Sequence, residues 1–137
     1  MASQTSPSPI ALSVAAAEES LRHVDPQTPA DALPHLRAAQ EHLTAAIDEA
    51  MAAVVVADGS TIRNAGALAG LSENAVGPRL ARTSLLAAYV SPDAQRVTAA
   101  GVERARYDLE EGRHRTPPPG PDGELPKPMR FRTRRST

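Results

Sequence analysis

The stretch that decides the expected fold is Thr61–Leu80, TIRNAGALAGLSENAVGPRL. Gly70 in its middle can adopt φ > 0 and so turn the chain between two short helices. Gly66 provides a small residue where these helices would cross closely. Ser72 can cap the second helix, since its hydroxyl can accept an N–H bond from the first turn, and Val76 would then point inward. The stretch therefore predicts two short helices joined by a glycine turn.

The limits of these two helices follow from caps and breakers. Ser60 is expected to cap the first helix, over Thr61–Ala69, and the second is expected over Glu73–Gly77. Gly77-Pro78 then interrupts the pattern. Because proline fits the first turn of a helix, Arg79–Val90 either restarts as a new helix or continues the second one with a kink.

Upstream, a long helix is predicted over Pro34–Ala57, ending at Asp58-Gly59. Its stripe of positions spaced by fours and threes keeps to one face: Leu36, Gln40, Leu43, Ile47, Ala50 and Val54. A shorter helix is predicted over Ile10–Val24, followed by a loop at the Asp-Pro and Thr-Pro pairs. The alternative for residues 54–62 is a β-hairpin, since Asp-Gly suits a type I′ turn.

Downstream, Ser91-Pro92-Asp93 has the cap, proline and acid of a helix start, and this helix should run to about Gly112. Its apolar stripe is Ala94, Val97, Val102, Ala105 and Leu109. The prolines that follow stop regular structure. We therefore expect an all-α protein: a small helical bundle over 10–112 with a helix-turn-helix at 60–82, a disordered segment 1–9, and a disordered Pro-rich basic tail 113–137.

Composition narrows the class further. The chain of 137 residues has no cysteine, which excludes disulfides and thiolate metal sites. No signal peptide and no membrane span are evident, so a cytoplasmic protein is expected. The net charge of −1 hides an asymmetry: residues 113–137 hold seven Lys/Arg against two acids, hence +5, which leaves −6 for the rest. Aromatic residues are only 2%, so a homodimer partner could supply missing burial.

The pattern Ala69-Gly70-Leu71-Ser72-x-x-x-Val76 resembles the helix-turn-helix of DNA-binding regulators from high-GC bacteria and their phages and plasmids, over about 36–82. One departure is Arg79, where the family has an apolar residue. The resemblance implies sequence-specific binding of double-stranded DNA by a transcriptional or mobile-element regulator, with the second helix in the major groove. An ordinary three-helix core with a glycine turn is the alternative.

The resemblance also assigns contacts. Asn74 would bind adenine, and Glu73 would accept from cytosine unless it only favours the helix N-terminus. The remaining candidates for DNA contact are Thr61, Arg63, Ser72, Arg79 and Arg82, together with the tail residues Lys127, Arg130, Arg132, Arg134 and Arg135. The tail could bind DNA backbone or minor groove, or instead an acidic protein.

No catalytic constellation stands out, so no enzyme, metal or cofactor is expected. His35 and His42 are seven apart and lack the closer spacing and further ligands that zinc needs. A homodimer could form through the 36–54 stripe or the 92–112 helix. The alternative function is a small helical adaptor that binds protein through the 36–56 helix and the basic tail.

Overall fold

The computed structural model describes residues 6–115, and the all-α prediction is confirmed for them. Their one extended pairing is an isolated bridge between Ser91 and Arg96. The predicted disordered segment and tail fall largely outside this range. The elements are α1 (Pro9–Arg22), α2 (Pro29–Val56), α3 (Ile62–Ala69), α4 (Glu73–Leu80), the 3-10 turn η1 (Ala87–Tyr89) and α5 (Ala99–Glu110).

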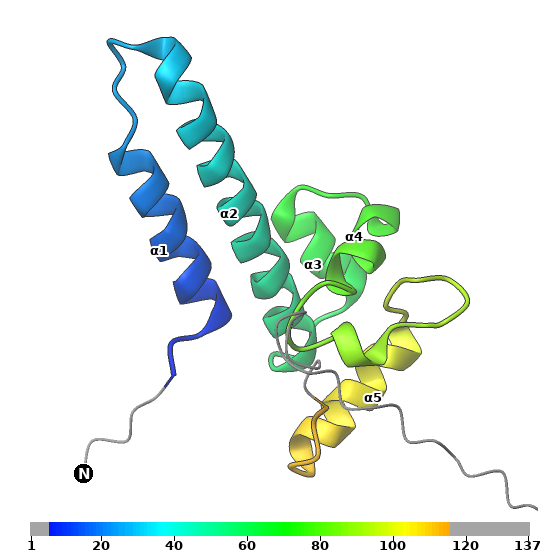
Figure 1. Ribbon diagram of the computed structural model, residues 1–137. Coiled ribbons are helices and arrows are strands. Elements are labelled where there is room, and N and C mark those ends of the chain that lie inside the picture. Colours follow the sequence, from blue (N-terminus) through cyan, green and yellow to red (C-terminus); the bar gives the residue numbers. More distant parts are fainter. Residues whose placement is uncertain (1–5, 116–137) are drawn as a thin grey trace, which may run out of the picture.

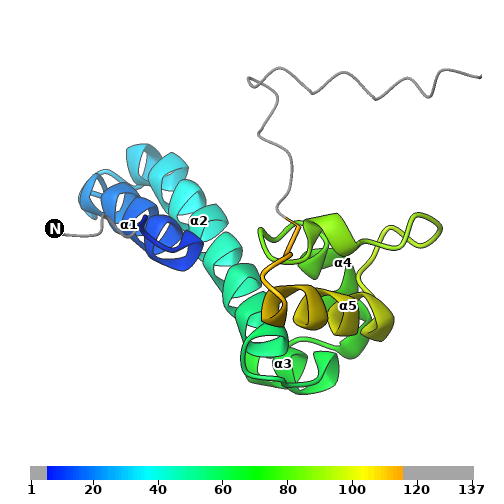
Figure 2. The same cartoon turned by 90° about the horizontal axis from the view of Figure 1, so that it is seen from below.

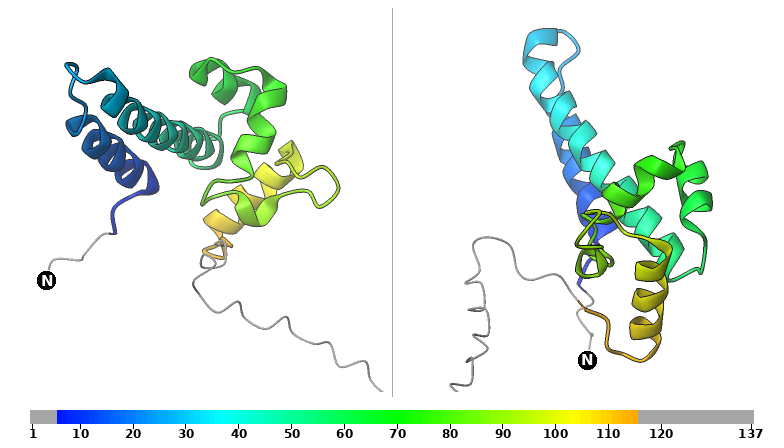
Figure 3. Two further views of the ribbon diagram at one scale, coloured as in Figure 1. Left: turned by 45° about the horizontal axis from the view of Figure 1, so that its top comes forward. Right: turned by 90° about the vertical axis from the view of Figure 1, so that its right-hand side faces the viewer.

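The helices form two parts that share α2. In the first, α1 and the start of α2 run antiparallel as a hairpin that projects from the rest of the molecule (Figure 1). In the second, α3, α4 and α5 gather around the end of α2, as the view from below shows (Figure 2). The further views show that the hairpin extends away from α3, α4 and α5 (Figure 3). The hairpin and the body therefore have separate surfaces.

Local signals explain the hairpin, with one correction. Ser8 caps α1, since its Oγ accepts a bond from the Ala11 N–H at 3.1 Å. α2 begins at Pro29, five residues before the predicted start at Pro34. Pro29 occupies the first turn, where its missing N–H has no helical partner. Pro34 sits close behind, so it removes a single bond near the helix start and the helix continues through it.

The core of the body is built around the end of α2. Its largest fully buried side chains come from α2, α4 and the segments that follow: Val55, Val76, Leu80, Thr83, Leu86 and Val97. The β-hairpin alternative for residues 54–62 is wrong, because α2 stays helical to Val56. Gly59 does have positive φ, 72°, but it serves the short connection to α3.

The segment after α4 departs from the prediction. The predicted helix over Arg79–Val90 does not form. α4 ends at Leu80, and the rest of this range contains a single short helical element, the 3-10 turn η1. The predicted helix start at Ser91-Pro92-Asp93 is also wrong. Those residues form a tight loop in which the Ser91 N–H donates to the Arg96 carbonyl at 2.9 Å.

The physical reason is competition from a tertiary contact. The Val97 N–H donates to the Gly77 carbonyl of α4 at 3.1 Å, which holds the strand-like end of the loop against α4. The chain is then free to start α5 only at Ala99, where Thr98 accepts a bond from the Gly101 N–H at 3.4 Å. The predicted stripe is accordingly split, with Val97, Val102 and Ala105 buried and Ala94 exposed.

Arg106 ties α5 to the end of α2. Its Nε donates to the Val55 carbonyl at 2.8 Å, and its Nη2 donates to the Ser60 carbonyl at 2.6 Å. The last carbonyls of a helix have no partner within the helix, so this guanidinium satisfies one of them. The contact fixes the connection from which α3 starts.

Tyr89 offers a pH test of the packing of α5. Its buried hydroxyl donates to Asp108 Oδ2 at 2.8 Å and accepts from the Arg115 N–H at 2.9 Å. Burial raises the Tyr89 pKa above its usual 10.0; the Arg115 N–H opposes this increase and Asp108 adds to it. Because the folded pKa is the higher one, this stabilisation is present below about pH 10 and is lost as pH rises through the folded pKa.

We expect a 295 nm titration of the Tyr107→Phe variant, which leaves Tyr89 as its single tyrosine, to show this increase. The midpoint should lie above 10.0 in the folded protein and return to about 10 in urea. Tyr107 is exposed, so its replacement should not disturb the fold. A folded midpoint at or below the urea value would contradict the buried hydrogen-bonded phenol.

Candidate nucleic-acid interface

The close crossing of α3 and α4 depends on Gly66. A Cβ at this position would lie 2.7 Å from Val76 Cγ2, and Val76 itself is fully buried. The turn between the helices has Gly70 at φ 73°, a left-handed conformation that glycine adopts without strain. The Leu71 N–H donates back to the Gly66 carbonyl at 2.8 Å. The predictions for the crossing and for the turn residue are confirmed.

The caps differ in part from the prediction. Thr61, and not Ser60, caps α3: its Oγ1 accepts from the Asn64 N–H at 3.0 Å. Ser60 instead binds the Asn64 side chain, whose Nδ2 donates to its Oγ at 2.7 Å. Ser72 has the extended backbone of an N-cap for α4, yet its side chain makes no capping bond. The exposed Ser72 hydroxyl is therefore not committed to the helix.

α4 continues through Gly77-Pro78 to Leu80, so the expected interruption does not occur. Pro78 is exposed and lies in the second turn, where its missing N–H removes one helical bond. Gly77 is buried for a different reason: a Cβ there would lie 2.8 Å from Arg96 Nε. The small residue makes room for the Arg96 side chain.

The N-terminal turn of α4 presents three polar side chains to solvent. Ser72, Glu73 and Asn74 are all exposed, while Val76 and Leu80 face the core. Asn74 and Pro78 stand four residues apart and so share the outward face. The start of α4 therefore offers a hydroxyl, a carboxylate and an amide to solvent.

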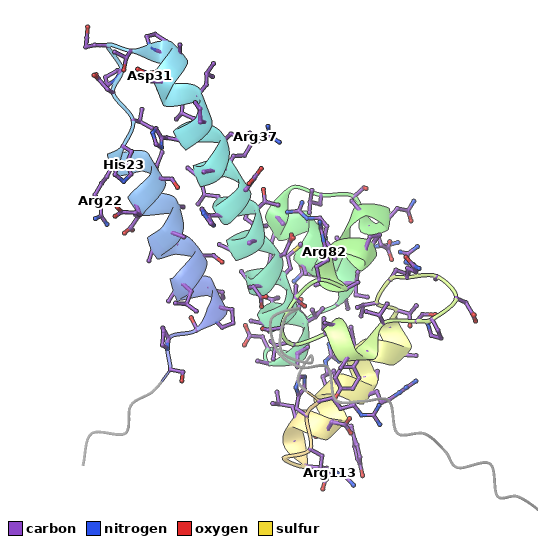
Figure 4. The ribbon with its side chains drawn as sticks, in the orientation of Figure 1. Arg22, His23, Asp31, Arg37, Arg82 and Arg113 are labelled. Carbon is purple, nitrogen blue, oxygen red and sulfur yellow. The ribbon has the colours of Figure 1, made fainter. Side chains whose placement is uncertain are left out.

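The arginines predicted to contact phosphate have different surroundings. Arg63 Nε lies 3.1 Å from Glu73 Oε2, in a pair whose two side chains are both exposed. Arg82 is also exposed and projects beside α4 (Figure 4), with its Nη2 3.9 Å from Asp48 Oδ2. Arg79 is turned inward: its side chain is 20% exposed and its Nε donates to Asp48 Oδ1 at 2.6 Å. Arg79 therefore holds α4 against α2.

Sequence reasoning missed the residues that position α4 from a distance. Asp48 of α2 holds Arg79, and its neighbour Glu49 accepts bonds from the Ser84 N–H at 2.9 Å and from the Ser84 hydroxyl at 2.8 Å. These partners are 31 and 35 residues apart, beyond the reach of any spacing rule. No local signal pointed to them, because by helical phase both acids lie about 120° or more from the apolar stripe of the predicted helix, where exposed charges are expected.

Arg96 was also missed. Its guanidinium lies against Gly77, and it lines a cavity of about 480 Å³ that Thr61, Arg63, Glu73 and the start of α5 also line. Among the ion pairs formed within residues 6–115, none includes Arg96. The cavity thus brings three arginines, Arg63, Arg96 and Arg106, together with the N-terminus of α3 beside the start of α4.

Charge is distributed in favour of this region. Residues 60–98 contain four arginines against Glu73 and Asp93, whereas residues 1–58 contain two arginines against eight acids. The acidic character of the protein thus belongs mainly to the hairpin and α2. The tail candidates Lys127, Arg130, Arg132, Arg134 and Arg135 lie outside the described residues.

No protein-family model matches this chain, and no curated protein or solved structure is significantly similar to it. Within residues 6–115, no three histidine, aspartate or glutamate side chains gather as metal ligands would. His35 lies beside His23, the residue that follows α1, with ring centroids 5.4 Å apart. No helix in the described part of the chain has both the length and the apolar character needed to cross a membrane.

Proposed function

We propose that α3, the Gly70 turn and α4 form a helix-turn-helix that binds double-stranded DNA, with α4 in the major groove. The observation that carries the proposal is the crossing itself, in which Gly66 lies against Val76 and Gly70 has φ 73°. This geometry leaves the first turn of the second helix uncovered, which is where such units contact base edges.

Asn74 is the residue proposed to read sequence. Its amide is exposed, and no hydrogen bond engages it in the described part of the chain. A side-chain amide can donate to and accept from the N7 and N6 edge of adenine at once. Ser72, with its uncommitted hydroxyl, stands at the same end of α4.

The exposed Arg63 and Arg82 and the partly exposed Arg96 are proposed to contact phosphates on both sides of α4. Arg63 stands near the start of α4 and Arg82 just beyond its end, and Arg96 stands beside Gly77. Such contacts fix register and orientation but carry little sequence information. The Arg63–Glu73 pair is exposed and so contributes little stability. It can therefore open or turn toward DNA at small cost.

The proposal predicts separate effects for base and phosphate contacts, measured by gel shift with fragments of the source genome. Asn74→Ala should weaken binding to the preferred site by roughly 5- to 150-fold and leave random DNA unaffected. Arg82→Ala should weaken binding to both about equally and lower the salt slope by about one. Removal of residues 127–135 should weaken binding and flatten the salt dependence in the same way.

Gln27→Ala is the matched control, since this exposed amide lies in the connection between α1 and α2, at the far end of the hairpin from α4. It should bind DNA as the unmodified protein does. Absence of binding at low salt would overturn the proposal, and equal losses on specific and random DNA from Asn74→Ala would refute the base contact alone.

A protein adaptor is the second candidate, favoured by the apolar side chains that the hairpin exposes, including Leu36 and Leu43. Recovery of one stoichiometric protein partner, by a chain that lacks DNA affinity, would support this candidate against the first.

A further inference from the structure

The contact between α1 and α2 is made of small residues. Ala17 is the one buried residue of α1, and the buried residues on the matching part of α2 are Ala32, Ala39 and Ala46, seven apart. Alanine lets two helices approach closely but buries little apolar area. Most of the larger apolar side chains of the hairpin therefore lie outside the contact between α1 and α2.

These larger side chains collect on one flank of the hairpin. On α1, Val14 stands three residues before Ala17 and Leu21 four after it. On α2, Leu36 and Leu43 stand at the same offsets from Ala39. In two antiparallel helices, equal offsets from the contact line fall on the same side of the pair. We call Val14, Leu21, Leu36, Leu43 and Ile47 the hairpin face; each is 38 to 46% exposed.

The hairpin face continues toward the body. The α2 positions 36, 40, 43, 47, 50 and 54 follow alternate spacings of four and three, the spacing by which one helix packs along another of similar length. Beyond Ile47 they border an apolar groove of about 220 Å³ between α2 and α3, in which Leu68 is 73% exposed. Gln40 is the single polar residue in this row.

One charged residue lies on the hairpin face. By helical phase the charged residues of α2 lie about 100° or more from the centre of this row, whereas Glu18 follows Ala17 as Gln40 follows Ala39 and so stands on the face. Two of the α2 residues are already engaged in the body, Asp48 with Arg79 and Glu49 with Ser84. The acidic residues of α2 therefore lie away from the contact between two such faces, unlike Glu18 of α1.

We propose that the hairpin face is covered by the hairpin face of a second copy of this chain, so that two hairpins form a four-helix bundle about a two-fold axis. A two-fold contact buries the same residues on both sides, so an apolar face meets an equally apolar one. The partner must also offer a long, apolar helical surface. Within the described residues the hairpin is the element that does so, and the basic Pro-rich tail is unlike it in composition.

The size of the face is close to the lower limit for a stable dimer. α1 has 14 residues and is about 21 Å long, so the face is two helices (about 20 Å) wide over that length, and α2 alone continues it for about 10 Å; each copy therefore offers roughly 500 Å². Stable interfaces bury about 600 to 1,000 Å² on each partner. The inference does not depend on DNA binding, because it concerns the free protein.

Sedimentation velocity of the full chain without DNA tests the inference. At micromolar concentration the unmodified protein should sediment as a species of twice the 14.4 kDa chain mass. Leu43→Glu and Leu21→Glu should each raise the dimer dissociation constant at least about 100-fold, since each charge enters the interface twice. Far-UV circular dichroism should show unchanged helicity, because both leucines are partly exposed in the single chain.

Leu12→Glu is the matched control. Leu12 is an exposed leucine of the same helix, 57% exposed, but it lies off the hairpin face by helical phase. This variant should remain dimeric. A monomeric unmodified protein would overturn the inference, as would a dimer that survives both Leu21→Glu and Leu43→Glu. Loss of DNA binding with the dimer intact would refute the proposed function and leave this inference standing.

Discussion

Replacement of Asp48 by alanine should lower the free energy of unfolding by about 2 to 4 kcal/mol, measured by urea denaturation followed by circular dichroism. The Asp48 side chain is 9% exposed and its Oδ1 lies 2.6 Å from Arg79 Nε. Its removal leaves the Arg79 guanidinium, 20% exposed, without its carboxylate partner. Removing one partner of a buried ion pair costs more stability than removing one partner of an exposed pair, because the remaining charge is left unpaired. Since Arg79 keeps some contact with solvent, the loss should stay below that of a fully buried pair.

Glu41→Ala provides the matched control for this prediction. Glu41 is on the same helix and pairs with Arg37, Nε to Oε1 at 3.3 Å, but both side chains are more than two-thirds exposed. Exposed pairs of this kind contribute about 0.5 kcal/mol or less. Both acids pair with an arginine, but the Glu41 pair is exposed and lies within α2, whereas the Asp48 pair is largely buried and joins α2 to α4.

A double-mutant cycle assigns the loss to the pair. If Asp48 and Arg79 stabilise each other, the Asp48→Ala/Arg79→Ala variant should be less destabilised than the sum of the two single changes, by more than about 1 kcal/mol. Additive losses would mean that Asp48 acts through its own packing. The interpretation of Arg79 as a structural residue of α4 would then fail.

The sequence was most informative where the constraint is local. The positive φ at Gly70 and the small residue at Gly66 were predictable because two short helices joined by a tight turn require both, whatever surrounds them. The exact cap was less certain. Ser60 and Thr61 are adjacent hydroxyls, and the choice of Thr61 depends on the path of the chain out of α2.

Prediction failed where tertiary contacts outweigh local signals. Ser91-Pro92-Asp93 has all the features of a helix start, but the loop bond from Ser91 to Arg96 and the bond from Val97 to Gly77 displace α5 to Ala99. The prediction that Arg79 contacts a phosphate also failed because of a tertiary contact, its ion pair with Asp48. Nothing in the spacing of the chain indicates that Asp48, 31 residues earlier, lies beside it.

The long stripe of α2 shows a third kind of limit. Its periodicity correctly predicted one apolar face, yet the contact with α1 is formed by alanines on the neighbouring face. Periodicity reports that a face is apolar and cannot say which neighbour covers it. The exposed leucines of that stripe are what the proposed dimer explains.

Gly66→Leu should have a larger effect than Asp48→Ala, with a loss of about 3 kcal/mol or more in the free energy of unfolding and a melting temperature lower by roughly 10 to 20 °C. Even a single Cβ would meet Val76 Cγ2 at 2.7 Å and the Leu71 carbonyl at 3.2 Å. Val76 is fully buried and β-branched, and Leu71 O belongs to the backbone of the turn, so neither can yield without moving α4.

Ala67→Leu serves as the control, because Ala67 is the next residue of α3 and is exposed. This variant adds the same leucine side chain at a position outside the contact between α3 and α4, so it should change the melting temperature by only a few degrees. Similar melting temperatures for the two variants would show that the helices do not cross closely at Gly66.

The smaller change Gly66→Ala isolates the contact itself. Here the clash is partly offset by alanine's better helix propensity, worth about 1 kcal/mol. Val76→Ala removes the atom that the new Cβ would meet, so Gly66→Ala should cost less in the Val76→Ala background than in the unmodified protein.

If α4 binds DNA, Gly66→Leu should also abolish binding at temperatures where the protein stays folded, because Asn74 and Arg82 shift with α4 relative to Arg63. Retained binding by a folded Gly66→Leu protein would separate the crossing from DNA contact and would refute the assignment of α4 as the recognition helix.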